Sequence, residues 1–405
     1  MIDKREILAA AEYTSLTPHI VEKDYVLGWM LAGIYGHGNL AKDWIFKGGT
    51  CLKKCFFETY RFSEDLDFTL RKPEHLDINF LKNAFSEIGE WIYDRTGIEI
   101  PADKQEFEIY QNPRGQISCM GKIKYKGPVS SPHSLPHIKL DLTADERIVL
   151  PPVRVQIFHS YSDVPKDGIE VLAYDYTEVF AEKFRALAER ARPRDLYDVV
   201  HLYRNAEVRP DPQYFMEILR AKCEFKGINI PCMGDLESHR ADLEAGWIHM
   251  LKHQLPVSIP VVMFWNALPE IFDWLEGSVT QLLATMPADL DSTLIRERLI
   301  DLPTGSRGQS FIEIIRFAAA NHLLIEIDYR DKQGNRSVCE IEAYSLRRSR
   351  AGEVLLMAVH ADSGHLCSYS VGSILGVKVI QTSFEPRYSI ELTSLSSPST
   401  PKSDG

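Results

Sequence analysis

Two aspartates, Asp65 and Asp67, lie in the alternating run Asp-Leu-Asp-Phe-Thr-Leu. This alternation of polar and apolar residues predicts a β-strand. Because residues i and i+2 of a strand project from the same face, both carboxylates point to one side of it. Oxygen ligands of this kind suit Mg²⁺, which fills its remaining positions with water and substrate phosphates. The pair therefore predicts a magnesium site.

A glycine turn, Phe46-Lys47-Gly48-Gly49-Thr50, precedes this strand and opens a predicted helix over residues 50–58. The free backbone N–H groups at a helix N-terminus bind phosphate well. We expect Gly48, Gly49 and Thr50 to bind the phosphates of a nucleotide. Either motif alone is usually only a turn or a strand end. Both together, separated by one helix, indicate metal-assisted nucleotidyl transfer.

The combination resembles the polymerase-beta-type nucleotidyltransferase superfamily, in which Gly-Ser/Thr is followed by Asp-x-Asp. The resemblance implies that Asp65 and Asp67 hold Mg²⁺ and that a third carboxylate lies on a later strand. Asp141, in the alternating apolar run Ile-Lys-Leu-Asp-Leu-Thr, has the required setting.

A second group of charged residues lies on two predicted helices, over residues 178–192 and 194–205. Lys183 and Arg190 are spaced i, i+7 on one helical face, and Asp195 and Asp198 are spaced i, i+3 on the next helix. Such runs are usually solvated ion pairs. Lys183, however, follows an apolar stretch at the start of its helix, where a compact positive charge can reach a triphosphate.

Four blocks in this order resemble the AbiEii/AbiGii abortive-infection nucleotidyltransferase toxins over residues 1–280. The blocks are the glycine turn, the run from Arg61 to Phe68, Ala-Glu-Lys183 and Arg194-Asp-Leu-Tyr-Asp198, and Glu22-Lys-Asp-Tyr25 fits as well. The resemblance implies a phage-defence toxin paired with an antitoxin that often carries a DNA-binding winged helix. It also implies a nucleoside triphosphate substrate and an RNA acceptor, with tRNA expected.

The resemblance assigns roles by position. Gly49 and Thr50 would hold phosphates, and Asp65 and Asp67 the metal. Lys183 would contact the triphosphate with Arg190 nearby in the nucleotide site. Asp195 would act near the acceptor hydroxyl or order Lys183.

The expected fold class is α+β, with a polymerase-beta-like α/β core, a helical subdomain and a small C-terminal barrel. We assign residues 1–176 to the catalytic core, 177–285 to the helical subdomain and 286–308 to a linker. Residues 309–393 form the predicted Sm/SH3-like barrel, because one helix is followed by short, closely spaced strands. The Ser/Pro-rich tail, residues 394–405, is predicted to be disordered.

The C-terminal segment, residues 310–392, resembles the WYL domain, a small barrel used for ligand sensing. The match rests on Ile327-Asp-Tyr329, Tyr344-Ser-Leu346 and the run from Phe384 to Tyr388, whereas Val-Leu-Leu356 stands where the family has Trp-Tyr-Leu. Arg347, Arg348 and Arg350 form either a patch for an anionic or nucleic-acid ligand or an exposed loop.

The composition describes an ordinary soluble protein: 405 residues, 44% of them hydrophobic, and a net charge of −11. This charge argues against a surface that coats nucleic acid but leaves room for a local basic patch. No apolar run is long enough to span a membrane, and the charged N-terminus does not resemble a signal peptide. Seven irregularly spaced cysteines indicate reduced thiols and a cytoplasmic location.

Two other functions fit parts of the same pattern. A small-molecule nucleotidyltransferase, of the kind that modifies aminoglycosides, suits the acidic composition, although the Lys183 and Asp195 blocks fit the toxins better. A ligand sensor with an inactive N-terminal half is the alternative of another class, but every carboxylate needed for catalysis is present.

Overall fold

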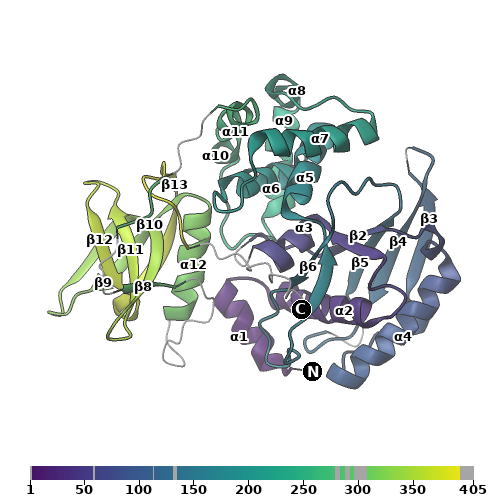
Figure 1. Cartoon of the computed structure of the whole chain (residues 1–405). Coiled ribbons are helices and arrows are strands. Elements are labelled where there is room, and N and C mark those ends of the chain that lie inside the picture. The colour runs from purple at the N-terminus through teal and green to yellow at the C-terminus, as the bar shows by residue number, and fades with distance from the viewer. Residues whose placement is uncertain are drawn as a thin grey trace, which may run out of the picture.

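The computed structural model describes residues 2–57, 60–112, 114–130, 135–278, 283–287, 292–295 and 308–392. A mixed sheet with its helices forms the N-terminal part, a group of helices follows, and an antiparallel sheet with one helix forms the C-terminal part (Figure 1). None of the helices in these ranges is long and apolar enough to cross a membrane.

The N-terminal part is built on a seven-stranded sheet in the order β3-β4-β5-β2-β1-β7-β6. Strands β2 and β5 are parallel, as are β1 and β7, and the other neighbours are antiparallel. Its strands are β1 Trp44–Lys47, β2 Asp65–Leu70, β3 Glu106–Gln111, β4 Ile117–Lys124, β5 His137–Thr143, β6 Val153–Gln156 and β7 Glu170–Ala173. Its main helices are α1 Lys4–Thr14, α2 Pro18–Gly36 and α4 Ile78–Thr96.

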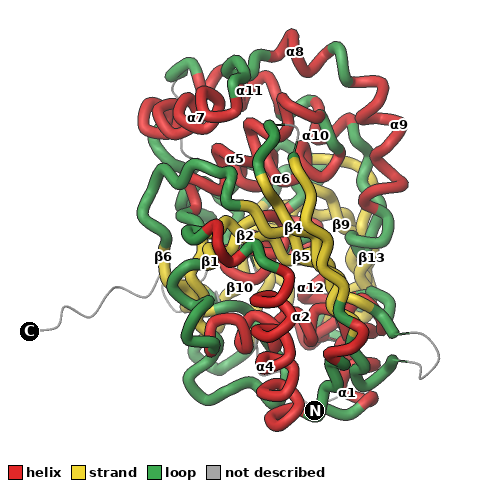
Figure 2. The backbone as a smooth tube through the Cα atoms, turned by 90° about the vertical axis from the view of Figure 1, so that its right-hand side faces the viewer, coloured by secondary structure: helices red, strands yellow, loops and turns green. Residues whose placement is uncertain are grey.

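The two faces of this sheet differ because the strand sequences alternate. Leu66, Phe68 and Leu140 point to one face and join a buried apolar core with residues of α2 and α4 such as Met30 and Ile88. The intervening positions carry the predicted catalytic aspartates on the other face. In Figure 2 the strands run between α2 and α4 below and the helical group above.

The strand predicted around Asp65 and Asp67 is confirmed as β2, and Asp141 lies on β5, but two features of this part differ from the predictions. The helix expected over 50–58 begins at Gly48, and its short turn α3 Gly48–Cys51 continues as a π-helical turn, Leu52–Phe56. Strands β6 and β7 were not predicted, because each has only four residues and so shows too little periodicity.

The helical part covers the upper end of the aspartate-bearing face (Figure 1). Helix α5 begins one residue after its N-cap, Asp175, whose carboxylate accepts the N–H of Thr177. It ends at Arg190, and its C-cap residue Ala191 has a φ of 44°. The helices are α5 Tyr176–Arg190, α6 Pro193–Arg204, α7 Pro212–Lys226, α8 Met233–Glu237, α9 Arg240–Leu251, α10 Val262–Trp265 and α11 Leu268–Leu275.

The C-terminal part contains an antiparallel sheet in the order β12-β11-β10-β9-β13, with α12 packed against it. Among the described strands no pairing joins β12 to β13, so the sheet is not shown to close into the predicted barrel. Its elements are β8 Ser292–Leu294, α12 Gly308–Ala320, β9 Leu323–Arg330, β10 Arg336–Ser349, β11 Val354–His360, β12 Leu366–Ser370 and β13 Ile374–Ser383.

Strand β8 lies inside the predicted linker and pairs with β10, so this part of the linker prediction is wrong. The rest of that range is described only at residues 286–287, 295 and 308, and the predicted disordered tail lies outside the described residues. Helix α12 packs beside α1, and the Tyr13 hydroxyl donates to Glu313 at 2.9 Å.

Candidate active site

The three predicted carboxylates lie on two neighbouring parallel strands. Asp67 of β2 is directly opposite Asp141 of β5, and Asp65 is opposite Lys139. Neighbouring strands are about 5 Å apart, so partners in register share one face at close range. The structure therefore brings Asp65, Asp67 and Asp141 together, as the sequence predicted.

Burial and mutual repulsion disturb the ionisation of this carboxylate group. The pKa of Asp67 is raised to about 7, first by burial and then by the charges of Asp141 and Asp65. Burial also raises the pKa of Asp141. A cation that neutralises these charges would relieve both effects, so the residues fit a divalent metal in this respect.

These residues would supply only some of the ligands of a metal ion. In the described ranges no group of three His, Cys, Asp or Glu side chains is placed so that it could hold a metal ion by itself. Mg²⁺ is commonly held by one or two carboxylates together with water and substrate phosphates. Asp65, Asp67 and Asp141 are the residues that would provide the protein's share.

The glycine turn lies directly against the carboxylates. Gly48 has a φ of +79°, and a Cβ atom there would be 2.1 Å from Oδ2 of Asp67, so only glycine fits. Thr50 is buried, its hydroxyl donates to the Asp65 carbonyl, and the hydroxyl of Ser63 lies 3.0 Å from the Thr50 hydroxyl. Thr50 thus ties the turn to β2, and the phosphate-binding role of Gly48, Gly49 and Thr50 stays a prediction.

Lys183 points from α5 towards the same face and is held by α6. Its Nζ atom is 2.8 Å from Oδ2 of Asp198 and 3.8 Å from Oδ1 of Asp195. The positive charge of Lys183 partly opposes the rise in the pKa of Asp67 that burial and the other carboxylates cause. Arg190 donates to both oxygens of Asp195 at 2.8 and 2.9 Å. Of the two roles expected for Asp195, these contacts agree with the ordering of Lys183; the acceptor role stays a prediction.

The structure adds two residues that the sequence did not place in the site, Arg61 and Asp198. Arg61 is fully buried and forms a bidentate pair with Asp198 at 2.6 and 2.7 Å. Burial alone would raise the pKa of Asp198, but the charges of Arg61 and Lys183 hold it below its usual value. Arg61 also approaches the glycine turn, because a Cβ on Gly49 would be 2.7 Å from its Nη2 atom. Both residues belong to the blocks that carry the family resemblance, which was the available signal.

Lys47, immediately before the glycine turn, is a further unpredicted member. Its Nζ atom is 3.3 Å from Oε1 of Glu182 and 3.7 Å from Oε2 of Glu146. Burial alone would lower the pKa of Lys47, but Glu182 and other acidic neighbours, which include Asp67, raise it above its usual value. Since Glu182 adjoins Lys183 in the chain, this pair links the turn to α5.

The Glu22-Lys-Asp-Tyr25 block supports the site from α2. Glu22 accepts the backbone N–H groups of Val129 and Ser130. Lys23 pairs at 2.8 Å with Glu64, the residue before Asp65. Asp24 pairs at 2.8 Å with the buried ammonium group of Lys54, so the block anchors the segments on both sides of β2.

The C-terminal arginines do not form one exposed patch. Arg347 is buried and pairs with Glu391 at 2.5 Å, because its side chain points into the unit from β10. A surface cavity of about 470 Å³ in this unit is lined by Glu342, Phe384, Arg387 and their neighbours. None of its lining residues belongs to the carboxylate site.

Comparison with known proteins gives a family match over residues 29–276, to the model described as nucleotidyl transferase AbiEii toxin, type IV TA system. No curated protein sequence matches the chain. Among solved structures, MenT4, a nucleotidyltransferase toxin from Mycobacterium tuberculosis H37Rv, is 18% identical, with a TM-score of 0.39 and coverage of 68% of this chain and 97% of that one. JHP933 from Helicobacter pylori is also 18% identical, with a TM-score of 0.40 and coverage of 65% and 95%. Because both TM-scores are below 0.5, these two likenesses support no conclusion by themselves.

The family match covers more than half of the chain and contains the glycine turn, all three carboxylates, Lys183 and Asp195. It ends before α12, so the C-terminal sheet lies outside it. On this match the chain belongs to the AbiEii nucleotidyltransferase toxin family of type IV toxin-antitoxin systems.

Proposed function

We propose that the chain is a magnesium-dependent enzyme that transfers a nucleotide from a nucleoside triphosphate to an RNA, with tRNA as the expected acceptor. The observation that carries this proposal is the convergence of Asp65, Asp67 and Asp141 with Lys183 beside the Gly48 turn. Anionic oxygen ligands, a cation and free backbone N–H groups are what a triphosphate and its metal need.

In the proposed reaction the acceptor oxygen bonds to the α-phosphorus, the bond from that phosphorus to the bridging oxygen breaks, and pyrophosphate leaves. Mg²⁺ would neutralise charge on the attacking and leaving oxygens. Lys183, held by Asp198, donates to a phosphate oxygen of the triphosphate. Asp67 must be ionised to share the metal, and the acceptor's proton passes to a site carboxylate or to water. The protein acts mainly by positioning and charge neutralisation.

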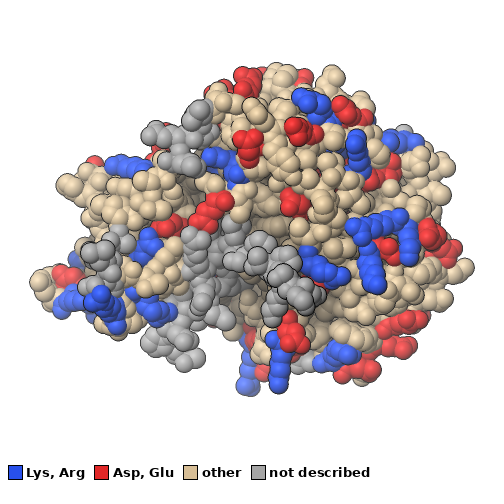
Figure 3. Space-filling model, viewed as in Figure 1, with Lys and Arg blue, Asp and Glu red and all other residues tan. Residues whose placement is uncertain are grey.

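A row of lysines beside the carboxylates favours an RNA acceptor over a small molecule. Lys139 is opposite Asp65, and Lys122 is opposite Lys139 on the next strand, with Lys124 two residues further along. Lys and Arg side chains gather over β4 and β5 in Figure 3, on an otherwise acidic protein. Glu106 pairs with Lys122 and Lys124, but exposed pairs of this kind are weak. Such a row can hold a phosphodiester backbone that leads to the site.

Membership of the toxin family supports a proposal for the wider biological role. We propose that the protein is an abortive-infection toxin active in the cytoplasm, controlled by an antitoxin that is encoded nearby and carries a DNA-binding winged helix. The C-terminal sheet, outside the family match, is proposed to be a WYL-like module that binds an anionic or nucleic-acid ligand, as its sequence resemblance implies.

The direct test incubates the purified protein with each labelled nucleoside triphosphate, MgCl₂ and total RNA, followed by gel electrophoresis. We expect label in an RNA band with the native chain and with the surface control Asp362→Ala, and none with Asp65→Ala or Lys183→Ala. Lys124→Glu, at the far end of the lysine row, should weaken labelling of RNA without weakening triphosphate binding.

Absence of label in every RNA, with transfer to a small molecule instead, would overturn the RNA proposal. Expression in cells gives a second readout: Asp65→Ala should abolish growth inhibition, and unaltered toxicity of this variant would contradict an enzymatic mechanism.

A further inference from the structure

The C-terminal unit contacts α6, the helix whose Asp198 pairs with Lys183 of α5. Helix α12 ends at Ala320, and the next residue, Asn321, is almost fully buried. Its Nδ2 atom donates to the Phe317 carbonyl at 2.8 Å and so caps the end of α12. Its Oδ1 atom is 3.0 Å from Nε2 of His201, on α6. One side chain therefore joins the two parts of the chain.

The ring of His201 is neutral and has a defined tautomer. Burial lowers its pKa to about 3. Because the amide group of Asn321 is already committed to Phe317, its oxygen faces His201, and Nε2 must carry the hydrogen of this bond. A buried hydrogen bond of this type is costly to leave unmade.

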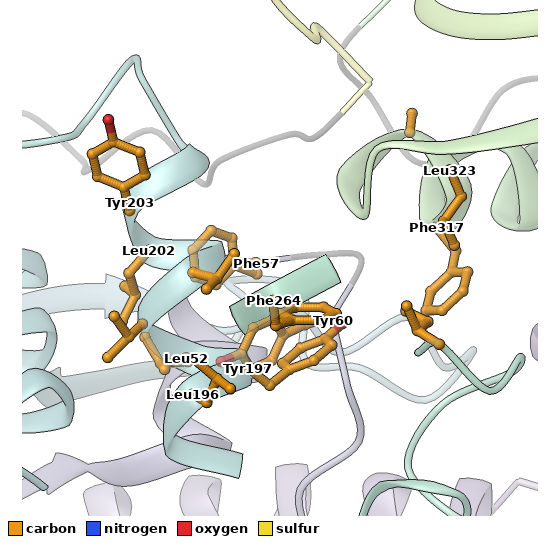
Figure 4. Close-up of a cluster of buried hydrophobic side chains, with 14 of the residues drawn as sticks. Leu52, Phe57, Tyr60, Leu196, Tyr197, Leu202, Tyr203, Phe264, Phe317 and Leu323 are labelled. Atoms are coloured by element: carbon orange, nitrogen blue, oxygen red, sulfur yellow. The ribbon is translucent and has the colours of Figure 1, made fainter. Parts of the chain in front are cut away.

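His201 lies one helical turn after Asp198, the partner of Lys183. Its ring packs against Tyr197, with centroids 4.4 Å apart, and meets the edge of Tyr60 at 5.5 Å. Tyr60 in turn donates its hydroxyl to Asp198. In Figure 4, Tyr60 and Tyr197 lie in one cluster of rings, with Phe317 of α12 on the facing element. The contact at Asn321 is thus continuous with the group that orients Lys183.

We propose that the C-terminal unit is a fixed part of the catalytic apparatus, with Asn321 as a positioning residue that sets α6 and, through Asp198, the ammonium group of Lys183. This proposal rests on the proposed function, in which Lys183 binds the triphosphate. The proposal gives a role to a unit that lies outside the family match. Without the C-terminal unit, α6 would lose the contact between His201 and Asn321.

The kinetic test compares Asn321→Ala in the full chain with Asn335→Ala, a control in the exposed β9–β10 turn. We expect Asn321→Ala to raise the KM for the nucleoside triphosphate about tenfold, as for a typical coupling between sites, while the KM for RNA stays unchanged. His201→Ala should give a similar change, and the double variant should be no worse than either single one. Unchanged kinetics with a lowered Tm, or effects of the two substitutions that multiply, would overturn the proposal.

A second measurement does not depend on nucleotide transfer. Lysine acylation by an N-hydroxysuccinimide ester, quantified by peptide mass spectrometry, reports how well Lys183 is held, with exposed Lys332 as the internal reference. Lys183 should react slowly in the native chain and several-fold faster in Asn321→Ala, but not in Asn335→Ala. Equal rates would refute the positioning role even if transfer occurs. A faster rate in a protein that transfers no nucleotide would instead refute the proposed function alone.

Discussion

Replacing Asp67 by asparagine should stabilise the metal-free protein at neutral pH. Unfolded aspartate ionises near pH 4, whereas Asp67 in the folded chain ionises near pH 7 because of burial and the charges of Asp141 and Asp65. Between these values the unfolded state loses its proton first, so the free energy of unfolding falls as pH rises from about 4 to 7. Below pH 4 Asp67 is protonated in both the folded and the unfolded state, so its ionisation does not change the free energy of unfolding.

The size of the effect follows from the pKa shift. A rise of about three pKa units corresponds to roughly 4 kcal/mol. Asp67 keeps some contact with solvent, which screens its neighbours, so we expect about 1–2 kcal/mol. For a catalytic core of this length that is a change in Tm of roughly 2–8 °C.

The assay is thermal unfolding in EDTA at pH 5 and pH 7.5, for the native chain, Asp67→Asn and the exposed control Asp103→Asn. We expect Asp67→Asn to have the higher Tm at pH 7.5 and a much smaller advantage at pH 5. Added MgCl₂ should then raise the Tm of the native chain but not that of Asp67→Asn. A variant less stable than the native chain at pH 7.5, or an equal difference at both pH values, would refute the reasoning.

Three further predictions follow from the geometry. Gly48→Ala places a methyl group against the Asp67 carboxylate and should lower transfer activity about 100-fold, whereas Gly115→Ala, with a similar φ but open surroundings, should lose only about 1 kcal/mol of stability. Arg61→Ala leaves a buried carboxylate without its main partner and should cost about 3–5 kcal/mol in urea unfolding; a cost no larger than that of Arg336→Ala, an exposed pair, would contradict this. Chelation should abolish transfer, and MgCl₂ should restore it; persistent activity in EDTA would exclude a magnesium requirement.

The sequence alone determined the local features of the site. Alternation in residues 65–70 placed Asp65 and Asp67 on one strand face, because the two-residue period of a strand is a local property. The superfamily resemblance pointed to Asp141 on a later strand, and helical spacing placed Lys183 and Arg190 on one face of a helix. The order of these motifs along the chain indicated the toxin family, because a motif order can be recognised without knowing which residues are in contact.

Only the tertiary structure decided which groups meet. The register between β2 and β5, which sets Asp67 opposite Asp141, depends on strands that are far apart in sequence. The same holds for the predicted barrel. A barrel closes only if its two edge strands pair, and the alternation of residues along each strand cannot specify that pairing.

The bidentate Arg61–Asp198 pair and the Asn321–His201 contact join residues that are more than a hundred positions apart. Charge patterns along the chain do not reveal such pairs, because long-range packing decides which buried charge finds which partner. The sequence therefore determined the chemistry of the site. The fold decided what holds Lys183 in place and gave the C-terminal unit its contact with the catalytic core.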